Sequence, residues 1–272
     1  MTLTQNQSDV FSGERMHRFL ALSWLLVALH VSFFSTPGQY ADWRAALWSV
    51  ATTLSYAAIY LLPAIVLTLS ARRGLERFSK QAWAPWALGG IAIGLTGLTH
   101  VLLFADRIIH EMYGFHLNGF VLDLVLAPGG IASLGASRST ELTATLVVLV
   151  FFAVQAALYL WMHLLRALPA ALRGRRLVAM VLCLALGERV AYGFSHAANF
   201  QPIVFASERY PLYLPMTFRK VAAALGVESG KTEEGMKVKA IELSYPLVAL
   251  DVQPPAKPLN VVWLVAESLR FD

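Results

Sequence analysis

The chain has 272 residues, of which 57% are hydrophobic and only 14% are charged, and its net charge is +5. Soluble domains are about a quarter charged, so this composition excludes an ordinary soluble domain and indicates a membrane protein. The positive charge does not predict nucleic-acid binding, because the basic residues cluster in short loops between apolar runs, as membrane topology requires. The single cysteine, Cys183, cannot form an intrachain disulfide.

Five apolar runs each approach the roughly 20 residues that cross a bilayer as a helix. We therefore predict a cytosolic tail at 1–18 and, at 19–199, an all-α membrane domain of five transmembrane helices. The predicted spans are residues 19–35, 46–70, 86–104, 142–165 and 177–198. The first is predicted to be an uncleaved helix, because no small-x-small cleavage site follows it and further spans do.

The arginines and lysines predict the orientation of these spans. The tail and the loops after the second and fourth predicted spans hold ten of them, whereas the two alternate loops hold three, Arg44, Arg107 and Arg138. Loops rich in positive charge remain in the cytosol, so the tail is predicted to be cytosolic and everything after about Asn199 to lie outside. In a double-membrane bacterium this places the chain in the inner membrane, with its C-terminal part in the periplasm.

The predicted outer loop at 105–141 is too long for a simple turn. Apolar residues recur in it at helical spacing, which predicts a short amphipathic helix at the membrane surface: Leu117, Phe120, Val121, Leu124 and Val125. The glycine-rich stretch that follows, APGGIASLGAS, is either a phosphate-binding loop or a plain connection. The plain connection is favoured, because no Lys-Ser or Lys-Thr pair completes a P-loop.

Two charged residues, Glu188 and Arg189, fall inside the fifth predicted span. Ionisable groups within a membrane are unfavourable and usually face other helices. They form either a polar site for an ion or a lipid headgroup, or a structural contact in which Glu188 meets a neighbouring helix and Arg189 extends toward water. The histidines at 30, 100 and 196 lack ligand spacing and are predicted to be structural.

Residues 200–258 form a predicted outer linker. Pro215 suits the first position of a helix, and an apolar stripe at helical spacing predicts an interfacial helix over 215–226. The free amides of its first turn, together with Arg219 and Lys220, would favour a lipid phosphate. A plain amphipathic linker helix is the alternative.

The last residues, 259–272, are predicted to begin an α/β domain. Val261 to Ala266 form an apolar run rich in β-branched residues, which is typical of a strand buried on both faces. The run ends in Glu267. Because ligand-binding groups collect at the carboxyl ends of parallel strands, Glu267 is a candidate ligand for a metal ion.

The terminal sequence NVVWLVAESLRFD resembles the opening strand of membrane-anchored, sulfatase-like proteins of the alkaline phosphatase superfamily. Two further stretches, FHLNGFVLDLVLAPGGIASLG at 115–135 and YPLYLPMTFRKVAAALG at 210–226, are similar to inner-membrane sulfatase-like proteins of the PbgA/YejM kind. The resemblance implies a metal-dependent hydrolase or transferase acting on phosphate or sulfate esters of envelope lipids or glycans.

The resemblance also implies roles for particular residues. Glu267 would bind a divalent Mn, Mg, Ca or Zn ion, but only with a downstream domain that supplies the nucleophile and the other ligands. The chain itself carries no catalytic residue of that set, so whether it serves an enzyme stays open. In the PbgA-like branch the matching lipid-binding positions are Thr217, Phe218, Arg219 and Lys220.

The alternative function that follows is a non-catalytic regulator of envelope lipid supply. It would bind an anionic lipid such as lipid A or cardiolipin and contact a membrane protein partner. A transporter is the least favoured class, because the spans show no inverted repeat and no paired Gly or Pro interruptions.

Overall fold

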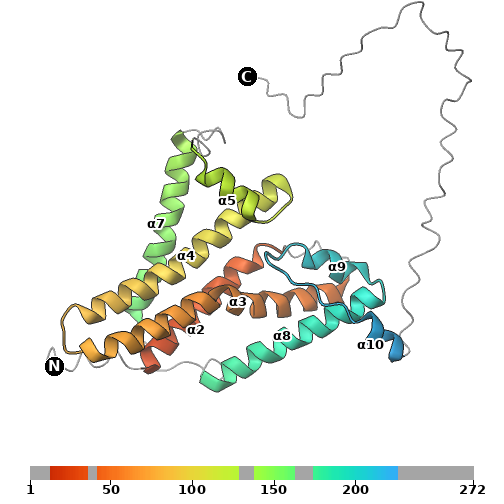
Figure 1. The fold of residues 1–272 in the computed structure, drawn as a ribbon, viewed down its shortest axis with the longest axis horizontal. Helices are drawn as coiled ribbons and strands as arrows, with labels where there is room; N and C mark the ends of the chain where they lie inside the picture. Colours follow the sequence, from red (N-terminus) through yellow and green to blue (C-terminus); the bar gives the residue numbers. More distant parts are fainter. Residues whose placement is uncertain (1–12, 36–41, 129–137, 163–173, 226–272) are drawn as a thin grey trace, which may run out of the picture. The chain divides into compact units, whose positions relative to one another are not determined.

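A computed structural model describes residues 13–35, 42–128, 138–162 and 174–225. Within these ranges the chain is all-helical and contains no strand (Figure 1). The long helices are α2 (Gly13–Ser32), α3 (Trp43–Leu75), α4 (Ala84–Tyr113), α7 (Arg138–Trp161) and α8 (Gly174–Ala197). The short ones are η1 (Glu76–Phe78), α5 (Gly119–Leu126), α9 (Gln201–Ser207) and α10 (Arg219–Ala224).

Four helices, α3, α4, α7 and α8, are long and apolar enough to cross a membrane. They correspond to the second to fifth predicted spans and confirm a multi-pass membrane protein. The first predicted span, 19–35, lies largely in α2, which is not among the four. Charged residues occupy the first turns of α2, namely Glu14, Arg15 and Arg18, and shorten its apolar part. Its passage through the membrane stays a prediction.

Helix α3 is the central element and packs against α2, α4 and α8. Its contact with α2 includes a hydrogen bond of 3.0 Å from the Trp24 indole nitrogen to the carbonyl oxygen of Leu54. Phe19, Val27 and Val31 of α2 are fully buried in the bundle. Although α2 begins with charged residues, its apolar face is therefore one of the best covered surfaces among the described helices.

Helix α7 packs against α4 at positions where α4 carries glycine. A Cβ atom at Gly97 would lie 2.5 Å from the ring of Phe152, and one at Gly89 would lie 3.0 Å from that of Tyr159. The rings of Phe152 and Tyr159 thus pack where α4 has no Cβ atom, which only glycine allows. Small residues allow this close approach between membrane helices, where no hydrophobic force drives association.

The chain reverses after α8 at Asn199, whose φ of 56° places it in the left-handed region. We call this end of the bundle, where α8 ends and α3 begins, the Asn199 end. Helix α9 follows, with Pro202 in its first turn, and contacts α3 and α8, while α10 contacts α8 (Figure 1). The sequence interpretation did not include α9, whose seven residues are too short for a periodic signal.

The interfacial helix begins later than predicted. Residues 213–218 are not helical, and α10 starts at Arg219 rather than at Pro215. The amides of Met216 to Phe218 are therefore not those of a first helical turn. Tertiary contacts described below hold this segment against α8 instead. Helix α5 agrees with the predicted amphipathic helix, and Asn118 caps it by accepting from the Val121 amide at 3.1 Å.

Several predictions concern residues outside the described ranges. They include the tail at 1–12, most of the glycine-rich stretch, the connector after residue 225, and the strand that ends in Glu267. These remain predictions.

Candidate functional site

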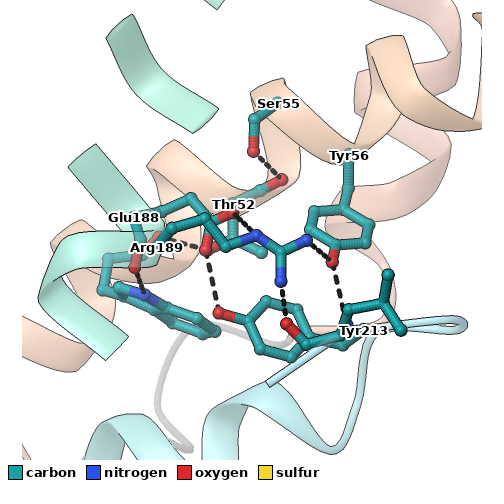
Figure 2. Close-up of polar contacts among 8 residues, drawn as sticks. Thr52, Ser55, Tyr56, Glu188, Arg189 and Tyr213 are labelled. Atoms are coloured by element: carbon teal, nitrogen blue, oxygen red, sulfur yellow. Dashed lines mark hydrogen bonds and ion pairs between the residues drawn. The ribbon is translucent and has the colours of Figure 1, made fainter. Parts of the chain in front are cut away.

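Glu188 and Arg189 lie nine and eight residues before the end of α8 at Ala197, or about 13 Å along the helix axis. Figure 2 shows them facing α3 and the segment that follows α9. Together with Tyr56 of α3 and with Tyr213 and Leu214 they form a group that we call the polar clasp.

Glu188 is 1% exposed, and its groups are contacted from three directions. The Tyr213 hydroxyl donates a hydrogen bond of 2.9 Å to Oε2. The Trp48 indole nitrogen donates one of 2.9 Å to the backbone oxygen of Glu188. The Arg189 Nε atom lies 3.0 Å from Oε1. The carboxylate is therefore paired with a charge and a hydroxyl, as a buried charge requires.

Arg189 joins the other members of the polar clasp. Its guanidinium donates to the backbone oxygen of Leu214 and to the Tyr56 hydroxyl. It also lies over two aromatic rings, 4.7 Å from the centre of Tyr213 and 5.3 Å from that of Tyr56. Such cation–π contacts strengthen where water is excluded. Glu188 thus meets Tyr213 in the segment after α9, and Arg189 meets that segment and Tyr56 rather than water; whether the pair also serves an ion or a lipid headgroup stays a prediction.

Two more tyrosines fix the same segment to α3. The Tyr210 hydroxyl donates to the backbone oxygen of Ser49 at 3.0 Å, and the Tyr60 hydroxyl donates to that of Pro211 at 2.6 Å. Burial raises the pKa of Tyr213, and the neighbouring Glu188 charge raises it further, so this hydroxyl remains a neutral donor. The result is a tightly held segment from Tyr210 to Leu214 at the Asn199 end.

The four predicted lipid-binding residues follow directly. Thr217 and Lys220 are exposed, whereas Phe218 is half-buried against α8. Its ring occupies the space above Gly193, where a Cβ atom would overlap it, and lies 6.2 Å from the ring of Phe194. Phe218 thus attaches the start of α10 to α8. Arg219 is the first residue of α10.

A second polar group crosses the bundle between α2, α7 and α4. Ser23 Oγ donates to Gln155 Oε1 at 3.0 Å, Gln155 Nε2 lies 3.0 Å from His100 Nε2, and the Nδ1 atoms of His100 and His30 are 3.1 Å apart. The sequence interpretation treated the two histidines as unrelated. They are 70 positions apart, so no spacing rule could have joined them.

Asp106, near the end of α4, holds together three segments at the Asn199 end. Its carboxylate is 3% exposed and accepts from His116 Nδ1 and from the Leu117 amide, each at 2.7 Å. The other ring nitrogen of His116 lies 2.9 Å from the backbone oxygen of Glu208, just after α9. Burial alone would lower the pKa of His116, but its hydrogen bonds to Asp106 and Glu208 and the Asp106 charge outweigh burial and raise it.

The raised pKa of His116 predicts a pH-dependent stability. A group whose pKa is raised on folding stabilises the fold fully below its unfolded value of 6.5, and this stabilisation disappears as the pH rises through the folded value. We expect the melting temperature of the purified protein to fall as the pH rises above 6.5. His116→Gln keeps a polar side chain but cannot titrate, so its melting temperature should fall less. Equal slopes in both proteins would contradict this assignment.

The described residues contain no group of three or more His, Cys, Asp or Glu side chains placed to hold a metal ion. The predicted metal ligand, Glu267, lies outside those residues. The polar clasp and the Asp106 group are instead closed sets of mutual contacts between helices and the segment from Asn199 onward. Their chemistry is that of docking, because each buried carboxylate lies beside a protein cation or histidine, although Glu188 Oε1 accepts no hydrogen bond and meets Arg189 only at ion-pair distance.

Comparison with known proteins assigns the chain to a family. A search of curated proteins found no match. Residues 16–252 match the family described as "Domain of unknown function (DUF3413)", a range that includes all the described helices except the first residues of α2. The chain therefore belongs to the DUF3413 family.

Proposed function

We propose that this chain is the membrane anchor of a sulfatase-like, metal-dependent hydrolase or transferase that acts on phosphate or sulfate esters of envelope lipids or glycans. The observation that carries the proposal is the polar clasp. An anchor must hold the segment that leads from its last span to the domain beyond. Here Arg189 and Glu188 attach that segment to α8 through Leu214 and Tyr213.

The predicted membrane orientation and the predicted strand at residues 261–266 also support this proposal. The distribution of basic residues predicts that the Asn199 end faces the periplasm, and the predicted connector would lead to the predicted strand that ends in Glu267. One carboxylate supplies only part of a divalent metal site, and the remaining ligands come from the downstream domain. Bound there, the metal would activate a hydroxyl nucleophile and neutralise charge on the transferring group.

The test is the metal content of the natural full-length protein. We expect purified wild-type protein to contain a divalent ion and to hydrolyse a chromogenic phosphate or sulfate ester. Glu267→Gln, which removes the charge with little change in shape, should lose both. Glu233→Gln, in the connector, is the matched control and should keep both. A wild-type protein without metal or turnover would exclude the enzyme.

The second candidate is a regulator that binds an anionic lipid such as lipid A or cardiolipin. It is favoured by the docked start of α10. Phe218 is attached to α8, so that exposed Thr217 and Lys220 lie beside the end of a membrane helix. Basic side chains at a membrane surface attract anionic headgroups. Thr217, Arg219 and Lys220 would contact the lipid phosphate, and Phe218 would position them.

Lipid binding can be measured with nanodiscs that contain cardiolipin or lipid A in a zwitterionic background. Lys220→Ala and Arg219→Ala should each weaken binding about fivefold, the factor for about 1 kcal/mol per basic residue at a membrane surface. Arg138→Ala, at the start of α7, is the control and should bind as wild type. Unchanged binding by the Arg219 and Lys220 variants would exclude this candidate, whatever the result for Glu267.

A further inference from the structure

A groove of about 500 Å³ lies between α3 and α4. This volume falls within the range of roughly 300–1,000 Å³ that is usual for ligand pockets. Its floor includes Ala64 and Leu103, which are 3% and 5% exposed. Its rim includes Leu67 and Leu98, about half exposed. Both walls belong to membrane-spanning helices, so the rim faces the hydrocarbon of the bilayer.

The groove runs along α3 and α4, so its length extends across part of the membrane. On α4 its lining extends from Leu95 to Asp106, eleven residues or about 16 Å. This is close to half of the roughly 30 Å hydrocarbon core. Pro211 and Leu212, in the segment held by the polar clasp, line the end of the groove near Asp106. The groove therefore begins at the Asn199 end and reaches about the middle of the bilayer.

The polar groups of the lining are already satisfied by the protein. The Tyr60 hydroxyl donates to Pro211, and the Thr99 hydroxyl donates to the backbone oxygen of Leu95 at 3.1 Å. Asp106 accepts from His116 and Leu117. A bound water needs two to four polar partners, so these groups offer it little. A groove that water does not fill needs an apolar occupant, because empty space forfeits packing.

We propose that the groove binds one acyl chain of a lipid from the membrane leaflet at the Asn199 end. An acyl chain is the apolar ligand available at this depth, and its span of one leaflet matches the length of the groove. Leu212 lines the mouth with a φ of 57°, a left-handed conformation that non-glycine residues rarely adopt and that occurs where a segment covers a ligand. The groove would recognise the acyl chain of the lipid rather than its headgroup, because the lining offers the headgroup no unpaired charge.

This site is separate from the proposed contact of α10 with lipid phosphates. The groove is formed by α3 and α4, whereas α10 packs on α8. Lys220→Ala should therefore leave acyl-chain binding unchanged. In a variant with both Arg219→Ala and Lys220→Ala, which lacks the basic side chains of α10, phosphatidylethanolamine and phosphatidylglycerol with the same chains should bind equally well. A strong preference between these two headgroups would overturn the proposal.

The test uses native mass spectrometry of the detergent-purified full-length protein with added dipalmitoyl phosphatidylethanolamine. We expect one tightly retained lipid per protein. Leu98→Trp fills the groove from its rim and should lower the lipid-bound fraction about tenfold, the factor for two buried methylene groups. Dioctanoyl phosphatidylethanolamine, with half the chain length, should also be retained less well.

Ile91→Trp is the matched control, because Ile91 is exposed on the same helix outside the groove. It should retain the lipid as wild type does. Leu67→Trp and Leu62→Trp repeat the comparison on α3, with only Leu67 in the lining. Equal retention by groove and control variants would overturn the proposal. A dimeric wild-type protein that the Leu98→Trp substitution dissociates would also overturn the proposal, because a second copy of the protein would then cover the groove.

Discussion

Arg189→Ala should destabilise the protein more than any other single substitution of a basic residue in the described spans. It leaves Glu188 buried without its charge partner and removes the donor that holds Leu214. Removing one member of a buried ion pair costs about 3 kcal/mol. For a chain of this size that corresponds to a fall of about 9 °C in melting temperature.

The matched control is Arg107→Ala on α4. Arg107 pairs with Glu111 at 2.7 Å, but both side chains are substantially exposed. Exposed pairs contribute little, so this variant should melt within about 2 °C of wild type. A second measurement reports on docking itself. Trypsin should cleave after Arg209 faster in Arg189→Ala than in Arg107→Ala. If the two variants have the same melting temperature and trypsin cleaves them at the same rate, the polar clasp does not hold the segment from Tyr210 to Leu214.

Gly193→Ala should release the start of α10 from α8. The new methyl group would overlap the Phe218 ring, which must leave its position. Overpacking of this kind costs about 1–3 kcal/mol. Gly187→Ala on the same helix meets nothing within 4 Å and should stabilise α8 by about 0.5–1 kcal/mol. Thermal melting of the two variants gives opposite shifts if the contact exists.

A double-mutant cycle separates this contact from other effects of the substitution. Phe218→Ala removes the ring, so adding Gly193→Ala to it should cost much less than in the wild-type background. The measured coupling should be about 1 kcal/mol or more, as for residues in direct contact. Additive effects would show that Phe218 and Gly193 act independently, and the attachment of α10 would need another explanation.

The sequence predicted those parts of the fold that depend on local composition. Apolar runs of membrane length located α3, α4, α7 and α8, and the periodic stripe around Phe120 located α5. Glu188 contacts Tyr213 and Arg189, as the rule that intramembrane charges face other protein groups would lead one to expect. Each of these features is encoded within a single segment, which is why a reading along the chain could find it.

The features that the sequence did not reveal depend on contacts between distant segments. Arg189 meets Tyr56 across 133 positions, and no pattern in either helix specifies that pair. The helical stripe after Pro215 predicted an earlier start for the interfacial helix. The hydrogen bond from Arg189 to Leu214 and the packing of Phe218 against Gly193 hold residues 213–218 in a non-helical form. Tertiary contacts therefore overrode local propensity there.

The row of hydrogen bonds from Ser23 to His30 also fixes where two protons sit. The Gln155 amide nitrogen can only donate, so His100 Nε2 accepts and the proton of a neutral His100 is on Nδ1. That proton points to His30 Nδ1, which must accept, leaving the proton of His30 on Nε2. All the dipoles in the row then point the same way, from α2 through α7 and α4 back to α2. Each bond polarises the next, so the row acts as one cooperative unit rather than three separate contacts.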